Sequence, residues 1–134
     1  MTREQSKRRG LRPLFSLVAH ASVAVDNAVM GEGPGEAIPA ALGKADMTLA
    51  DMDLIDVNEA FAAQALSVIQ EAGLNPETVN VNGGALALGH PLGCTGTKLS
   101  IQLLEEMKLR NQRYGMVTAC VGGGQGIAGI FERL

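Results

Sequence analysis

Three side chains suited to acid–base or hydrogen-bonding chemistry each follow an apolar segment of the chain: Asn58, His90 and Cys120. His90 directly precedes Pro91, in a loop with five glycines between positions 83 and 96. The proline restrains the backbone of His90, and the glycines allow backbone and ligand to approach closely. A lone histidine is more often structural, but one held in this way is a candidate hydrogen-bond donor or acid–base group.

Cys120 and Asn58 each allow two interpretations from their neighbours. Cys120 ends an apolar stretch and is followed, after Val121, by three glycines whose backbone N–H groups could face a ligand. A thiol beside exposed amides suits an oxyanion site, whereas a cysteine in a strand is ordinarily a small buried hydrophobe. Asn58 could cap a helix or hold a water or a substrate oxygen, and its neighbours do not decide. Cys94 lies at an expected helix start, and this position does not exclude it as a second reactive thiol.

A glycine pattern near the end of the chain matches a nucleotide-binding motif in its letters alone. Gly124, Gly126 and Gly129 fit GxGxxG. That motif needs a helix after it and an acidic residue about 20 positions further on. Only five residues follow Gly129, and they are expected to form a strand. The sequence therefore excludes a dinucleotide site of this kind.

The elements that must position these residues alternate between strands and helices. Strands are expected at residues 14–25, 53–57, 79–82, 114–121 and 127–132. Helices are expected at residues 2–10, 34–45 and 58–73. A further helix, capped by Thr95 or Thr97, is expected to reach Arg110. This alternation indicates an α/β layered domain, and the closing pair of strands indicates a mixed sheet. With no linker or repeat in the chain, residues 1–134 are expected to form one domain.

Composition and charge exclude several classes of protein. The chain is 46% hydrophobic and 19% charged, which argues against disorder, and its net charge of −3 argues against a nucleic-acid partner. The two cysteines lie 26 positions apart without CxxC or Cys/His spacing, so neither a metal site nor a disulfide is expected. Free thiols fit a reducing, cytoplasmic location.

Residues 14–25 carry the one ambiguity about targeting. Basic residues followed by this apolar run imitate a secretory signal peptide, but His20 and Ser22 interrupt it, which favours a buried strand. No stretch approaches the length of a transmembrane helix, so no membrane partner is expected.

Three motifs of this chain, taken together, resemble the C-terminal motifs of thiolases. They are Asn58-Glu59-Ala60-Phe61, Gly89-His90-Pro91 and Cys120-Val121-Gly122-Gly123-Gly124-Gln125-Gly126. This family comprises acetyl-CoA acetyltransferases and 3-ketoacyl-CoA thiolases, and the likeness runs from about Thr2 to the end. The resemblance implies a thiolase-like half with a layered, mixed five-stranded sheet and helices on both faces. It also implies a coenzyme A thioester as substrate, with no tightly bound cofactor and no metal.

The resemblance implies a role for each matching residue. His90 would activate the acyl-accepting cysteine and donate to an oxyanion, and Asn58 would hold the water that completes that oxyanion hole. Cys120 would remove a proton from acetyl-CoA in condensation and protonate the leaving enolate in thiolysis. The backbone N–H of Gly122 would help to form a second oxyanion hole. The acyl-CoA pocket would be lined by Met30 and Phe61.

The chain departs from the family pattern in a way that bears on activity. Thiolases consist of two similar halves, their nucleophilic cysteine lies in the first, and no counterpart precedes Leu14 here. Of the loop region that grips coenzyme A, a remnant is expected at residues 1–12. Cys94 falls where the family often has a small residue, so it is given no catalytic role. We therefore expect a C-terminal half that is inactive without the N-terminal half. Its expected protein partner is that half or another copy of the chain.

Two further interpretations stay open at this point. The chain could be a non-catalytic α/β module, or a truncated gene product, that binds a partner through an exposed apolar face. It could also be a relative of ketoacyl synthases, which share a Gly-rich histidine loop but match the Asn58 and Cys120 motifs less well.

Overall fold

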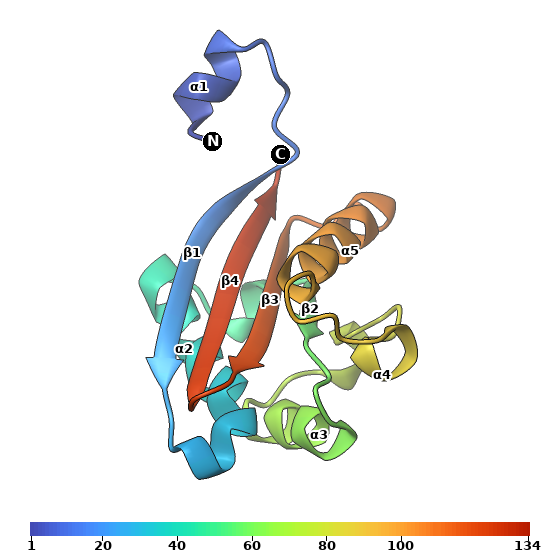
Figure 1. The fold of residues 1–134 in the computed structure, drawn as a ribbon. Coiled ribbons are helices and arrows are strands. Elements are labelled where there is room, and N and C mark those ends of the chain that lie inside the picture. The colour runs from blue at the N-terminus through green and yellow to red at the C-terminus, as the bar shows by residue number, and fades with distance from the viewer.

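Four strands form one sheet in the order β1–β4–β3–β2 (Figure 1). In the computed structural model, which describes residues 1–134, the strands are β1 (Phe15–Ala24), β2 (Leu54–Val57), β3 (Tyr114–Val121) and β4 (Gln125–Arg133). Strand β4 pairs antiparallel with both β1 and β3, whereas β2 pairs parallel with β3. The sheet is therefore mixed, as predicted.

The sheet has four strands where five were expected, because residues 79–82 do not join it as a strand. Val79 makes one isolated parallel bridge to Ile55. Asn80 then turns the chain away with a φ of 48°. Its side chain accepts a hydrogen bond from the N–H of Val57 (2.8 Å) and donates one to the carbonyl of Val57 (3.0 Å). The side chain of Asn80 thus occupies the backbone groups that a neighbouring strand would need.

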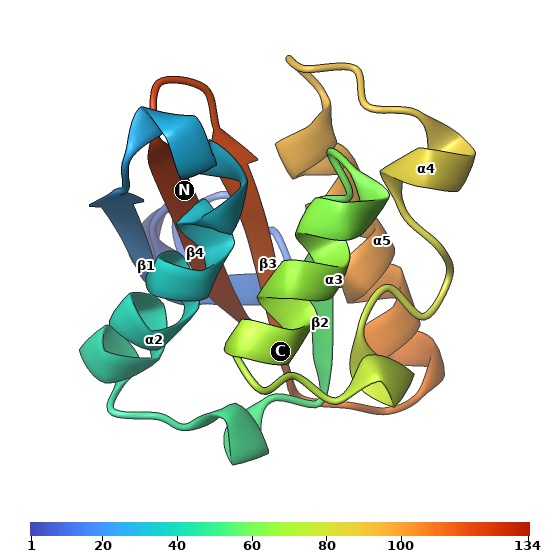
Figure 2. The same cartoon turned by 90° about the horizontal axis from the view of Figure 1, so that it is seen from below.

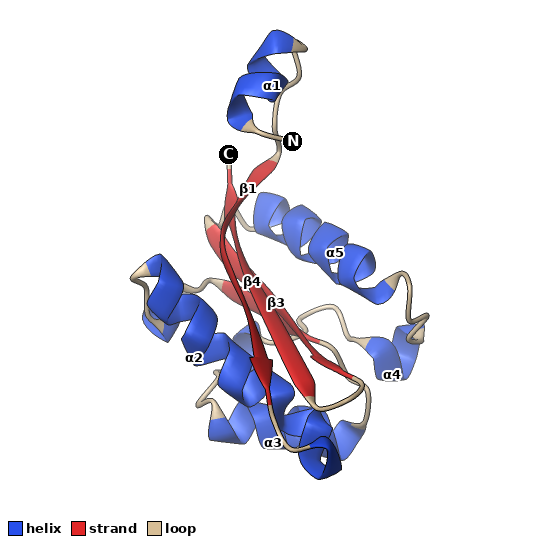
Figure 3. Ribbon diagram, turned by 60° about the vertical axis from the view of Figure 1, so that its left-hand side comes forward, coloured by secondary structure: helices blue, strands red, loops and turns tan.

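Helices cover both faces of the sheet, as predicted (Figure 3). Helices α2 and α3 lie on one side of the sheet, and α5 lies on the other. The α-helices are α1 (Arg3–Arg8), α2 (Gly33–Ala45), α3 (Ala62–Glu71), α4 (Ala85–Leu88) and α5 (Thr95–Leu109). Three 3-10 helices complete the set: η1 (Asn27–Glu32), η2 (Leu49–Asp51) and η3 (Pro76–Thr78). None of the helices combines the length and the apolar composition that crossing a bilayer requires.

The larger part of the core lies between α2 and the sheet. Ile38 of α2 is buried in one apolar cluster with Val57, Met116 and Ile130 from three strands. A smaller cluster lies under α5, where Leu103 and Met107 contact the other face of the sheet, as their helical spacing predicted. Gly115 makes this contact possible, because a Cβ there would stand 2.7 Å from the sulfur of Met107. Burial on both faces fixes the sheet between its helices.

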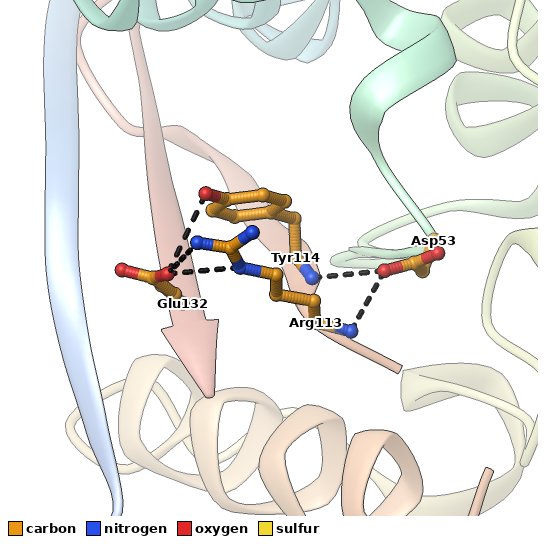
Figure 4. A network of polar contacts seen from close by, with 4 residues as sticks. All are labelled: Asp53, Arg113, Tyr114 and Glu132. Atoms are coloured by element: carbon orange, nitrogen blue, oxygen red, sulfur yellow. Dashed lines mark hydrogen bonds and ion pairs between the residues drawn. The ribbon is translucent and has the colours of Figure 1, made fainter. Parts of the chain in front are cut away.

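A polar cluster at the start of β3 holds the parallel pair β2–β3 in register (Figure 4). A carboxylate oxygen of Asp53 accepts hydrogen bonds from the backbone N–H groups of Arg113 (2.8 Å) and Tyr114 (2.9 Å). The Arg113 guanidinium donates to Glu132 of β4 at 2.6 Å and stacks over the ring of Tyr114, 4.8 Å from its centroid. Because register at this end sets the register at the other, the cluster determines which residues meet beyond the carboxyl ends of β2 and β3.

Helix α1 stands apart from the layers, beyond the start of β1 (Figure 1). A cavity of about 650 Å³ lies between this segment and the strand, with Ser6, Leu11, Phe15 and Leu134 in its wall. The cavity is therefore at the opposite end of the sheet from the carboxyl ends of β2 and β3. The origin of residues 1–12 as part of a loop region stays a prediction.

Candidate functional site

The Asn58 and Cys120 motifs meet at the edge of the sheet where β2 and β3 end. Val57 pairs with Thr118, and the N–H of Asn58 donates to the carbonyl of Thr118 at 2.9 Å. Cys120 follows two residues later on β3. Seen from below, α3, the α4 segment and the β3–β4 turn lie around this edge (Figure 2). Parallel pairing thus brings together two motifs that are far apart in the sequence.

The structure joins Asn58 to His90. The Nδ2 of Asn58 lies 3.3 Å from the Nε2 of His90. Asn58 is 1% exposed, and its Oδ1 is buried without a hydrogen-bond partner in the chain. The helix-cap interpretation of Asn58 is wrong, because α3 begins only at Ala62, with Phe61 in the cap position.

The second ring nitrogen of His90 is held by Thr95. Its Nδ1 lies 2.6 Å from the Oγ1 of Thr95, and this hydroxyl lies 3.2 Å from the carbonyl of Pro91. Thr95 is 3% exposed and is the first residue of α5. The expectation that a threonine side chain caps this helix is wrong, since Cys94 holds the cap position and no side-chain cap is formed. The hydroxyl of Thr95 contacts the histidine loop instead.

A stripe of polar side chains along α5 holds the whole histidine loop, residues 82–91. Lys98 donates to the carbonyl of Gly89 at 2.6 Å, and Gln102 donates to the carbonyl of Gly83 at 3.2 Å. Further along, Glu106 accepts a hydrogen bond from the side chain of Asn82 at 2.7 Å. With Thr95 these residues recur every three or four positions, so they share one face of the helix. Sequence reasoning missed them, although this polar spacing beside the apolar face of α5 is a signal that could have found them.

Glu59 links the Asn58 segment to the same loop from the other side. One carboxylate oxygen accepts a hydrogen bond from the side chain of Asn80 at 3.0 Å, and the other accepts one from the N–H of Leu86 at 3.1 Å. Gly84 packs over this carboxylate so closely that a Cβ at that position would clash with it. Sequence reasoning gave Glu59 no role beyond its place in the first motif.

Cys120 is a free, half-buried thiol, and no hydrogen bond connects it to His90. Burial raises the pKa of the Cys120 thiol, with a smaller opposing effect from its own backbone. Strand alternation places Cys120 on the sheet face of Met116 and Thr118, which α2 and η1 cover. Gly122 lies exposed in the following turn, and a Cβ there would meet no atom within 4 Å. The thiol and the turn amides therefore border open space.

The two residues expected in the acyl-CoA pocket lie on neighbouring elements. Met30 is half-buried in η1, and Phe61 is 64% exposed just before α3. These elements pack together, because a Cβ on Gly31 would stand 2.9 Å from the side chain of Gln64. Neither residue has a recorded hydrogen bond or ring contact with His90 or Cys120. No three His, Cys, Asp or Glu side chains are grouped closely enough to hold a metal ion.

The predicted resemblance is confirmed by comparison with known proteins. The family model described as "Thiolase, C-terminal domain" matches residues 11–133. The 3-ketoacyl-CoA thiolase of Bacillus subtilis (strain 168) is 56% identical over 132 residues, which are 98% of this chain and 34% of that protein.

Solved structures agree in fold and in extent. The crystal structure of the Bacillus anthracis acetyl-CoA acetyltransferase superposes with a TM-score of 0.97 at 46% identity, covering 100% of this chain and 34% of that one. Human mitochondrial 3-ketoacyl-CoA thiolase in complex with CoA gives 0.96 at 44% identity, covering 98% of this chain and 34% of that one. The chain thus spans about a third of the length of the relatives it matches. It belongs to the thiolase family and forms the C-terminal domain of that fold.

Proposed function

We propose that this chain supplies the C-terminal half of a thiolase active site. The complete site cleaves a 3-ketoacyl-CoA with coenzyme A or, in reverse, condenses acetyl-CoA with an acyl group. The observation that carries the proposal is the hydrogen-bonded pair of Asn58 and His90, at the sheet edge where Cys120 also lies. An N-terminal thiolase half provides the nucleophilic cysteine.

In thiolysis, His90 takes the proton of the N-terminal cysteine at Nε2, and the thiolate adds to the 3-keto carbon. The electron pair of the carbonyl moves onto its oxygen. That oxyanion receives hydrogen bonds from the protonated Nε2 of His90 and from a water held by Asn58. The amide of Asn58 suits this task by its position, 3.3 Å from the Nε2 of His90.

The bond between C2 and C3 then breaks, and its electrons leave with the acetyl-CoA unit as an enolate. Cys120 gives its proton to that carbon, while the backbone N–H of Gly122 donates to the enolate oxygen. Because burial raises the pKa of Cys120, the thiol holds this proton at neutral pH. Cys120 next takes the proton of the incoming coenzyme A thiol, whose sulfur attacks the acyl-cysteine. The released cysteine recovers its proton from His90.

Substrate contacts follow from the same arrangement. Met30 and Phe61 line the acyl-CoA pocket, and the exposure of Phe61 leaves its ring free for a ligand. The substrate is a coenzyme A thioester, which the CoA-bound human relative supports. The free state of both cysteines supports a reducing, cytoplasmic location.

An N-terminal half has an apolar surface available beside α5. Leu17, Val121 and Ile127 are exposed. Strand alternation places Ile127 on the face of Phe131, which packs under α5, and a Cβ on Gly129 would touch both Phe131 and Leu17. Helix α5 therefore covers one end of this face and leaves the rest to a partner. The remaining two thirds of a thiolase is the occupant that the 34% coverage supports.

Mixing the chain with the N-terminal two thirds of the Bacillus subtilis relative tests the proposal. We expect neither part to cleave acetoacetyl-CoA alone and the mixture to do so. His90→Ala or Cys120→Ser should lower the rate by at least about 100-fold. Cys94→Ala is the matched control and should retain the rate, since Cys94 has no place in these steps.

A complex that forms by light scattering, stays folded and shows no thiolysis would contradict the proposal. If the chain instead forms a stable homodimer and ignores the N-terminal part, it acts as an interaction module through its apolar face.

A further inference from the structure

Both ring nitrogens of His90 have a polar neighbour. Nδ1 lies 2.6 Å from the hydroxyl oxygen of Thr95, and Nε2 lies 3.3 Å from the amide nitrogen of Asn58. A neutral imidazole has one donor nitrogen and one acceptor nitrogen. The two contacts are therefore linked: whatever fixes the proton at one nitrogen also fixes the lone pair at the other.

We propose that Thr95 is a positioning residue that keeps the neutral ring of His90 protonated at Nδ1 and leaves the lone pair on Nε2. This inference rests on the proposed function, because it assigns Nε2 as the atom that accepts the nucleophile's proton. It adds a residue that acts on the reaction only through His90.

The neighbours of the hydroxyl decide its polarity. The carbonyl of Pro91 can only accept, and it lies 3.2 Å from the Oγ1 of Thr95. Once the single hydroxyl hydrogen of Thr95 is donated to this carbonyl, the oxygen has only lone pairs to offer, so Nδ1 must donate to it. At the other nitrogen, the amide group of Asn58 donates, so Nε2 must accept. The contacts at Nδ1 and at Nε2 therefore require the same tautomer, with the proton on Nδ1.

The local fold places the hydroxyl for this task in advance. Thr95 is 3% exposed, and the N–H groups of Cys94 (2.9 Å) and Thr95 (3.1 Å) also donate to the carbonyl of Pro91, which closes a tight turn directly after the histidine. Lys98 and Gln102 bond to the backbone of the loop, at Gly89 and Gly83. They locate the loop but do not touch the ring. Apart from Asn58, Thr95 alone makes a hydrogen bond to the imidazole.

The choice of a hydroxyl has a chemical consequence. A carboxylate at this position would orient the ring and also add a negative charge that favours the imidazolium. Thr95 orients the ring without adding charge. It therefore sets the tautomer without adding a charge beside the ring.

Nitrogen NMR of the isolated chain tests the tautomer without any need for activity. The chain has only two histidines, so long-range ¹H–¹⁵N spectra contain two ring systems, and His20→Gln assigns them. At a pH where the ring is neutral, we expect the Nδ1–H pattern for His90 in the wild type and in Thr95→Ser. Thr95→Val, which keeps the shape but loses the hydroxyl, should give a mixture of both tautomers. The signals of the exposed His20 serve as the internal control.

An Nε2–H pattern in the wild type would overturn the proposal, and so would an unchanged Nδ1–H pattern in a folded Thr95→Val. Backbone amide spectra report folding. If Thr95→Val does not fold, Thr95→Ala replaces it with the same expectation.

An activity measurement in the presence of the N-terminal half separates this inference from the proposed function. Thr95→Val should lower kcat by about 10- to 100-fold with little change in KM, and Thr95→Ser should restore it. If the wild-type mixture has no activity while the tautomer depends on Thr95 as expected, the proposed function fails and the positioning role stands. If the mixture is active and Thr95→Val equals wild type in kcat, the positioning role fails.

Discussion

The side-chain amide of Asn58 lies 3.3 Å from the Nε2 of His90, across 32 residues of sequence. This contact joins the end of β2 to the loop that leads into α5. Since Asn58 is buried and His90 is exposed, the amide anchors the ring from the protein side and leaves its outer side accessible. The pair thus forms the buried side of the candidate site.

Asn58→Ala should lower kcat for thiolysis by about 100-fold in the mixture with the N-terminal half and leave KM nearly unchanged. The reason is that an oxyanion donor acts mainly in the transition state. Steady-state rates with acetoacetyl-CoA check this. Asn75→Ala, at an exposed asparagine that bonds only its own turn, is the matched control. A kcat equal to that of the control would remove Asn58 from the mechanism.

Glu59→Ala should loosen the histidine loop by releasing the N–H of Leu86 and the side chain of Asn80. We expect a loss of about 1–3 kcal/mol in the free energy of unfolding. Amide exchange at Leu86 should speed up more than exchange within α2. Glu59→Gln retains one acceptor oxygen and should lose less than Glu59→Ala. Equal exchange at Leu86 in all three proteins would show that the carboxylate does not hold the loop.

Asp56 makes the stability of the domain depend on pH. Burial on β2, and to a lesser extent the charge of Glu106, raises the pKa of Asp56 to about 7. In the unfolded chain it is close to the usual ~3.9. Between these values the unfolded state loses a proton that the folded state keeps, so stability falls as pH rises from about 4 to about 7. Above that range both states are ionised, and the loss, at most about 4 kcal/mol, stops growing.

Asp56→Asn removes this ionisation. The free energy of unfolding of the variant, minus that of the wild type, should therefore increase from about pH 4 to about pH 7 and then level off. Urea unfolding at a series of pH values measures it. Asp46→Asn, at an exposed carboxylate, is the control for the substitution itself. If the difference in the free energy of unfolding does not vary with pH, the raised pKa of Asp56 is contradicted.

Cys120 should react slowly with iodoacetamide at neutral pH, because burial both covers the sulfur and raises the pKa of its thiol. Cys94 is exposed and should be alkylated first. The rate at Cys120 should keep rising to a higher pH than the rate of an ordinary thiol does, because burial raises its pKa. Timed labelling followed by peptide mass spectrometry distinguishes the two sites, and Cys94→Ala isolates the slower one. Faster labelling of Cys120 than of Cys94 at pH 7 would contradict the raised pKa.

Most of the fold follows from local patterns in the sequence. The spacing of Leu99, Leu103 and Met107 predicts the buried face of α5, and apolar runs predict all four strands of the sheet. The fifth expected strand failed because β propensity at residues 79–82 could not reveal that the side chain of Asn80 bonds the backbone of Val57. That bond depends on tertiary structure, which propensity does not contain.

The candidate site, like the fold, was predictable from the sequence only in part. The sequence motifs identified Asn58, His90 and Cys120 as candidate site residues, since polar or reactive side chains and glycines lie close together there. The neighbours of Asn58 left open whether it caps a helix or contacts a ligand, and its partner in the structure lies 32 residues away. Thr95 was expected to cap α5, whereas its hydroxyl turns back to His90. Local propensity assigned both polar side chains to the nearest helix end, and long-range contacts decided otherwise.

The polar stripe on α5 makes the histidine loop open or close as a whole. Contacts at Thr95, Lys98, Gln102 and Glu106 span almost the full length of the helix and hold both ends of the loop, so neither end can leave without breaking a bond to it. Loop and helix therefore form one cooperative unit, whose amides exchange together when it opens. The arrangement of side chains around His90 then persists for as long as α5 stays folded against the sheet.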